Sequence, residues 1–146
     1  MQPFSFISRH RFISTRKSKM KNYTIFLLLL LFFSSCSLSI HSVSKGKIDT
    51  PSKESYQVTY LANFNDSFVS KISFTNEYGD VENAKETIKS WNKTIVIKAG
   101  KHVKFSIVTK GNQARGEYKV LVDGKILDQH ILSGKKLKYN FEFDLP

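Results

Sequence analysis

The sequence has a single cysteine, Cys36, among 146 residues, so the chain cannot form an internal disulfide. This excludes the class of small secreted proteins whose folds depend on disulfide bonds. The four histidines, His10, His41, His102 and His130, are far apart in the sequence. Because metal sites need clustered ligands, we predict none, although His102 and His130 could meet across neighbouring strands. His41 is expected to be solvated.

Motifs for catalysis or nucleotide binding are also lacking. The chain has no serine-centred nucleophile elbow and no glycine-rich phosphate loop. Asp123 and Asp128 could be a pair of carboxylates for acid–base chemistry, but a turn explains Asp123 better and a solvent-facing position explains Asp128 better. We therefore predict that the protein is not an enzyme and needs no cofactor.

Acidic residues are absent before Cys36, whereas six of the 23 lysines and arginines precede residue 25. These six cations supply more than half of the formal net charge of +11. The later lysines are spread along predicted strands, as on an ordinary soluble surface. Lys135, Lys136 and Lys138 beside Tyr139 are only a faint form of the basic, aromatic stripe that binds nucleic acid, so no such partner is predicted. A weak contact of lysines with anionic lipid headgroups is compatible with this charge.

One long apolar run lies near the N-terminus. Residues 25–33 (IFLLLLLFF) follow Lys19 and Lys21 and precede two serines. A positive region, a short apolar region and a small-residue site are typical of a secretory signal peptide. At about 1.5 Å per residue, the run is too short for a hydrocarbon core of about 30 Å. The sequence thus predicts a signal peptide over residues 1–35, of which residues 1–19 are open to interpretation as a misassigned start.

The residues Phe33-Ser34-Ser35-Cys36 resemble the bacterial lipobox. This resemblance implies cleavage between Ser35 and Cys36, and diacylglycerol on the Cys36 sulfur. Two or more acyl chains hold a protein stably on a membrane, whereas one does so only marginally. The alternatives are a secreted protein with a free thiol and an uncleaved signal anchor. We expect a lipid-anchored protein of the cell envelope, with a periplasmic domain and the outer membrane favoured because Ser37, not aspartate, follows the lipid site.

Residues 36–55 contain serine, lysine and histidine and show no apolar periodicity, which predicts a flexible, lipidated tether. From residue 56 onward, apolar and polar residues alternate in short blocks, as in antiparallel strands. The predicted strand segments span residues 56–62, 68–75, 81–89, 94–98, 102–109, 118–122, 125–127 and 137–143. Residues 81–89 are interpreted as an edge strand.

Turn residues separate these blocks. Residues 76–80 form a predicted turn, and Asp123-Gly124 is typical of a tight hairpin. One face of each strand is apolar, so we predict an all-β, immunoglobulin-like antiparallel β-sandwich of about seven strands over residues 56–146. Trp91, the only tryptophan, is expected to pack at the edge of this core rather than to serve as a ligand platform.

The order of features over residues 56–143 resembles the MmpS-like family of small envelope proteins. The matching features are Tyr56-Gln57-Val58, Phe74-Thr75-Asn76-Glu77-Tyr78-Gly79, Trp91 before a strand, and Val122-Asp123-Gly124-Lys125-Ile126. Ser90 stands where the family usually has proline, and the family commonly has a membrane-spanning anchor instead of a lipobox. The resemblance implies a non-catalytic accessory domain, which in mycobacterial members works beside a lipid or siderophore exporter.

Two functions fit these features. The first is an interaction module that binds an envelope transporter or another envelope protein through a sheet face or strand edge. The alternative is a carrier that holds a small ligand, such as a lipid or siderophore, in a pocket between the sheets.

Overall fold

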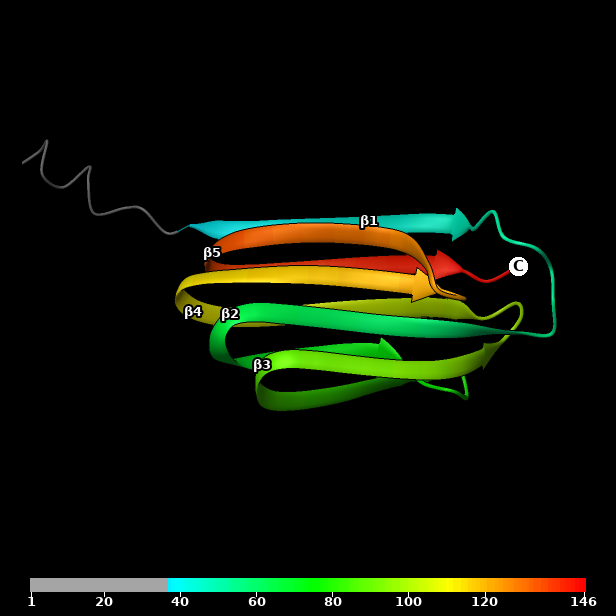
Figure 1. The fold of residues 1–146 in the computed structure, drawn as a ribbon, viewed down its shortest axis with the longest axis horizontal. Coiled ribbons are helices and arrows are strands. Elements are labelled where there is room, and N and C mark those ends of the chain that lie inside the picture. The colour runs from blue at the N-terminus through cyan, green and yellow to red at the C-terminus, as the bar shows by residue number, and fades with distance from the viewer. Residues whose placement is uncertain (1–36) are drawn as a thin grey trace, which may run out of the picture. The chain divides into compact units, whose positions relative to one another are not determined.

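The computed structural model describes residues 37–146, and the regular structure in this range is entirely β-strand (Figure 1). The prediction of an all-β fold is confirmed, whereas the predicted number of about seven strands is wrong. The five strands are β1 (Leu38–Lys47), β2 (Ser55–Thr75), β3 (Val81–Lys98), β4 (His102–Val122) and β5 (Lys125–Asp144).

The number differs because four strands continue through positions where the sequence indicates an end. β2, for example, contains both predicted segments, 56–62 and 68–75. The polar residues between them mark a shift in strand register rather than a turn. A bulge lets a strand bend while it keeps its hydrogen-bonded partners on either side, so a bend and a chain reversal look alike in sequence.

Hydrogen bonding joins the strands into one mixed sheet in the order β1-β5-β4-β2-β3. The pairings among β2, β3, β4 and β5 are antiparallel, but β1 runs parallel to β5. The prediction of a purely antiparallel sandwich is therefore wrong at this edge. The prediction that residues 81–89 form an edge strand is confirmed, since β3 is the other edge of the sheet.

The sheet folds over on itself. Strands β2 to β5 bend at the same end of the molecule, shown at the left in Figure 1, and return beneath themselves. The two halves form a first layer, with residues 55–64 of β2, and a second layer, with residues 68–75 of β2 and all of β1. The result is sandwich-like, but it is one folded sheet and not the two separate sheets of the predicted immunoglobulin-like domain.

Aromatic side chains fill the space between the two layers. Tyr60 of the first layer meets Phe105 of the second with ring centroids 5.1 Å apart, and Tyr118 stacks on Tyr139 at 4.7 Å. These four side chains are fully buried. The alternation in the sequence therefore correctly predicts which face of each strand forms the core. Other buried aromatic residues are Tyr56, Phe64, Phe74, Phe141 and Phe143.

Residues 38–47 form strand β1, so the predicted flexible tether over 36–55 and the predicted start of the domain at residue 56 are wrong for this segment. The usual alternation is reversed in the first residues of β1. Leu38 and Ile40 point outward and are 50% and 54% exposed, whereas Ser39 and His41 lie on the less exposed, inner side. Val43 faces inward in the usual way, but because Leu38 and Ile40 face outward and His41 faces inward, the strand as a whole carries no normal amphipathic signal.

The turns agree with the sequence. Asp123 and Gly124 have positive φ angles of 51° and 78°, as the predicted hairpin turn between β4 and β5 requires. The Asp123 side chain also accepts a hydrogen bond from the backbone N–H of Gln57 at 3.0 Å. The predicted turn over 76–80 joins β2 to β3, where the Asn76 N–H donates to the carbonyl oxygen of Asp80 at 2.8 Å.

The bend in β4 depends on a glycine. A Cβ atom at Gly111 would lie 2.3 Å from the Phe68 ring, whereas one at Gly46 would meet nothing within 4 Å. We expect Gly111→Ala to lower the free energy of unfolding by about 1–3 kcal/mol, because the ring must move from its packed position. Denaturant unfolding measures this change, with Gly46→Ala as the control. Equal effects of the two substitutions would contradict this role for Gly111.

Candidate interaction surfaces

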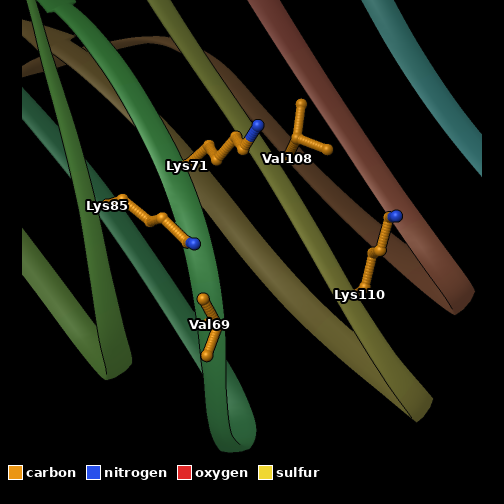
Figure 2. A pocket seen from close by; sticks show the side chains of 5 residues that line it. All are labelled: Val69, Lys71, Lys85, Val108 and Lys110. Carbon is orange, nitrogen blue, oxygen red and sulfur yellow. The ribbon is translucent and has the colours of Figure 1, made fainter.

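The outer face of the second layer has a shallow groove of about 260 Å³. Its walls are Val69 and Lys71 from β2, Lys85 from β3, and Val108 and Lys110 from β4. Figure 2 shows these side chains together on neighbouring strands. All five side chains point outward from their strands. The groove therefore combines lysine ammonium groups with exposed aliphatic surface.

The groove is part of a larger surface, which we call the basic face. The strand register aligns its residues in two adjacent rows that cross the sheet. One row reads Lys85, Lys71, Val108, Lys138 and Ile40 from β3 to β1. The neighbouring row, nearer the bend, contains Val69, Lys110, Lys136 and Leu38. Within residues 37–146, none of these lysines forms an ion pair with a carboxylate.

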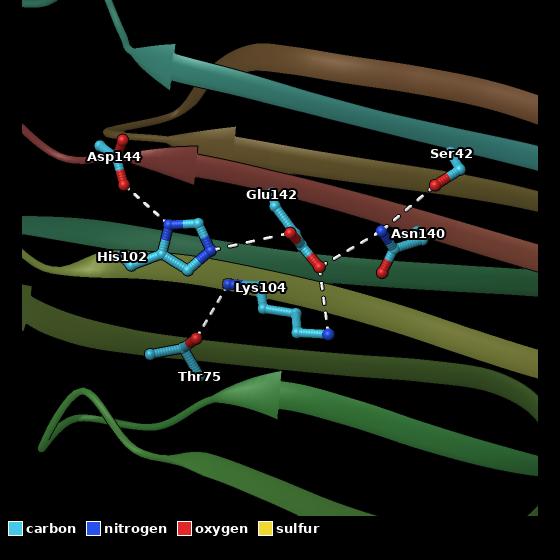
Figure 3. Close-up of polar contacts among 7 residues, drawn as sticks. All are labelled: Ser42, Thr75, His102, Lys104, Asn140, Glu142 and Asp144. Carbon is cyan, nitrogen blue, oxygen red and sulfur yellow. Dashed lines mark hydrogen bonds and ion pairs between the residues drawn. The ribbon is translucent and has the colours of Figure 1, made fainter.

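The opposite end of the same face has balanced charges (Figure 3). His102 Nδ1 lies 2.7 Å from Asp144 Oδ1, and Lys104 Nζ lies 3.1 Å from Glu142 Oε1. Asn140 donates a further hydrogen bond to Glu142 at 3.3 Å. Charge on this face is therefore polarised along the strands, from unpaired lysines near the bend to paired acids and bases at the open end.

The contribution of this end of the face to stability depends on pH through Glu142. The hydrogen bond from Lys104 is the main cause that lowers the pKa of Glu142 below its ordinary value of 4.5. A lowered pKa in the folded state stabilises the fold above the pKa of the unfolded chain, and this stabilisation is lost as the pH falls through the folded value. Glu142→Gln should therefore lower the free energy of unfolding at about pH 7 and have a smaller effect at about pH 3.

Urea unfolding at the two pH values tests this expectation. Glu77→Gln is a suitable control, because Glu77 lies in the exposed turn over 76–80 and forms no ion pair in the described part of the chain. If Glu142→Gln changed the free energy of unfolding equally at both pH values, the charge of the carboxylate would contribute nothing to stability.

A second cluster lies where β1 of the second layer meets β5 of the first. The His41 ring stacks on His130 at a centroid distance of 3.9 Å and on Tyr139 at 5.5 Å. Its Nε2 lies 3.5 Å from Asp128 Oδ2, without a hydrogen bond. The predictions of a solvated His41 and a solvent-facing Asp128 are wrong, since their side chains are only 17% and 15% exposed.

Hydrogen bonding and ring stacking hold this cluster together. The Tyr139 hydroxyl donates a hydrogen bond of 2.7 Å to Asp128 Oδ2. Burial, and then this contact with Asp128, raise the pKa of Tyr139, so the phenol keeps its proton. Burial likewise raises the pKa of Tyr118, which stacks on Tyr139. Through His41, this cluster holds β1 against the sandwich.

The structure places the predicted site residues as follows. Ser35 and Cys36, the proposed cleavage and lipidation site, lie outside the described residues. His102 and His130 do not meet: His102 pairs with Asp144, and His130 stacks on His41. Residues 37–146 contain no group of three or more histidine, cysteine or acidic side chains that could hold a metal ion.

Trp91 of the edge strand β3 is partly buried and packs against the core, as expected from the sequence. Its ring stacks on Phe105 at a centroid distance of 5.8 Å and is tilted against Phe74 at 5.3 Å. Because Phe105 also contacts Tyr60 and Tyr139, the tryptophan is part of one continuous aromatic cluster between the layers.

The outer face of the first layer differs from the basic face. Val96 of β3 and Ile126 and Ile131 of β5 are 56%, 51% and 49% exposed on it. Their register partners, Gln57, Leu121 and Glu117, all lie on this outward side. We call the outward side that carries Val96, Ile126 and Ile131 the aliphatic face. The strand pattern predicts their outward position, but only the order of the strands brings them onto one surface.

No protein-family model matches this chain, and a search of curated proteins found no match. In the described range, no helix is long and apolar enough to cross a membrane.

Proposed function

We propose that the protein is a lipid-anchored lipoprotein of the cell envelope whose β-sandwich domain is a non-catalytic interaction module. The observation that carries this proposal is the position of Cys36. It follows an apolar run and two serines and comes two residues before the first strand of the domain. A signal peptide with a lipobox explains this order, because cleavage before Cys36 would leave the folded sheet directly behind an acylated residue.

The surface of the domain supports the second part of the proposal. Val96, Ile126 and Ile131 expose aliphatic side chains on the outer face of the first layer. A protein partner that covers this outer face would bury these aliphatic side chains together with the polar residues around them. In keeping with the MmpS-like resemblance, we propose an envelope transporter, or another envelope protein, as this partner.

A small-ligand carrier has less support. The residues between the layers are fully buried aromatic and aliphatic side chains, including Tyr60, Phe105 and Tyr139. The groove lined by Val69 and Lys71 lies on the outer face of the second layer and not in this core. A lipid or siderophore needs a pocket of several hundred Å³, whereas the aromatic rings between the layers pack against one another.

Site-specific photo-crosslinking in living cells tests the interaction module. A photoreactive residue at Val96 or Ile131 should give a discrete adduct with an envelope protein, because these positions lie on the aliphatic face. The same residue at Tyr78, which is 73% exposed in a turn, is the control. Absence of a discrete adduct at Val96 and Ile131, or the same adducts at Tyr78, would contradict the proposal.

A further inference from the structure

The basic face keeps like charges next to one another at a cost to stability. Lys71 lies directly opposite Lys85, and Lys110 lies directly opposite Lys136. Opposed like charges on neighbouring strands destabilise a sheet. Lysines on edge strands can prevent edge-to-edge aggregation, but Lys71 and Lys110 belong to the inner strands β2 and β4. Protection of an edge therefore does not explain them.

Aliphatic side chains lie between these lysines. Leu38, Ile40 and Val69 are each about half exposed, at 50%, 54% and 53%. A surface of lysines and aliphatic residues suits the headgroup region of a bilayer, where ammonium groups meet phosphates and short apolar side chains reach the acyl boundary. No aromatic side chain belongs to the two rows of this face, so it lacks the stacking platforms of a nucleic-acid site.

The position of the face relative to Ser37, the residue that follows Cys36 in the sequence, points to the same partner. Leu38 and Ile40 belong to β1, which begins at the end of the sandwich where the strands bend (Figure 1). The backbone there is fixed, because the N–H of Lys135 donates to the Ser37 carbonyl oxygen at 3.0 Å. Cys36 directly precedes Ser37 in the sequence, so no spacer would lie between an acylated Cys36 and this fixed point. The lipid would then hold the lysine-rich end of the face at the bilayer.

Resting on the lipid anchor proposed above, we propose that the basic face binds the anionic phospholipid headgroups of the membrane that holds the anchor. The domain then lies with its second layer on the bilayer. Its first layer, with Val96, Ile126 and Ile131, faces away from the lipid and is open to a protein partner. The acyl chains anchor the protein, and the lysines set the orientation of the domain on the bilayer.

Lysine modification on vesicles tests this orientation. The native protein, purified from its host in detergent, is reconstituted into vesicles of phosphatidylcholine, with or without phosphatidylglycerol. An amine-reactive reagent is added, and the modified peptides are quantified by mass spectrometry. Phosphatidylglycerol should slow modification of Lys71, Lys85 and Lys110 at least about fivefold. Lys98 and Lys125, which are exposed away from the basic face, should react unchanged.

A pair of charge-matched variants makes the test specific. Lys71→Glu/Lys85→Glu should abolish the protection of Lys110 by phosphatidylglycerol, whereas Lys98→Glu/Lys125→Glu should retain it. High salt should also remove the protection, because it screens the attraction. Equal modification of both sets of lysines in both vesicles would overturn the proposal. Protection in intact cells but in neither vesicle would also overturn it, since another envelope component would then cover the face.

Failure of the anchor is distinguishable from failure of the face. Flotation with vesicles of phosphatidylcholine alone depends on the acyl chains and not on the lysines, so it reports the anchor separately. A protein that floats but shows no charge-dependent protection contradicts only the orientation proposed here. A protein that does not float contradicts the proposed lipoprotein.

Discussion

Replacing Cys36 by alanine is expected to release nearly all of the protein from the membrane into the soluble envelope fraction. Acyl chains on Cys36 are the proposed anchor, so this variant would lose its attachment to the bilayer. Each methylene that enters the bilayer contributes about 0.8 kcal/mol, and removal of two chains therefore abolishes stable binding. Fractionation of cells followed by immunoblotting measures the change.

Ser37→Ala is the matched control for this experiment, because it alters the next residue and leaves the thiol intact. It should leave the protein in the membrane fraction. Retention of the Cys36→Ala variant in the membrane, with the apolar run still attached, would instead support an uncleaved signal anchor.

Phe105→Ala is expected to have the largest effect on stability. The Phe105 ring is fully buried and contacts Tyr60, Trp91 and Tyr139, with centroids 5.1, 5.8 and 5.6 Å away. Removal of such a ring leaves a cavity and lowers the free energy of unfolding by about 3–5 kcal/mol. This is a large part of the stability of a typical small domain, which is about 5–15 kcal/mol.

Trp91, the only tryptophan, provides a direct readout of this change. Its emission should shift to longer wavelength in the Phe105→Ala variant, and the unfolding midpoint in urea should fall. Tyr78→Ala, in an exposed turn, should change the stability by less than about 0.5 kcal/mol. An equally small change for Phe105→Ala would show that the two layers are not held together by this aromatic cluster.

Alternation and turn chemistry are local properties, and they predict the all-β class, the core faces and the Asp123-Gly124 hairpin correctly. Tyr56, Phe105 and Phe143 are buried where the period of two places them. The number and continuity of the strands are not local. Nothing near residue 66 distinguishes a bend within one strand from a turn between two, because both need polar residues and a break in the register.

Strand β1 was not predictable for a related reason. It pairs in parallel with β5, about a hundred residues later, and its few inward contacts are made by His41 and Val43 rather than by a run of apolar residues. The basic face was not predictable either. Lys71, Lys85 and Lys110 look like ordinary outward residues of separate strands, and only the order β4-β2-β3 brings them together.

The proposed anchor and orientation both depend on the chemical state of Cys36 in the mature protein. Mass spectrometry of the N-terminal peptide, taken from protein purified from host membranes, measures that state directly. We predict a chain that begins at Cys36 and carries a diacylglycerol on its sulfur. A chain that retains residues 20–35 and has an unmodified thiol would contradict the lipid anchor and, with it, the proposed orientation on the membrane.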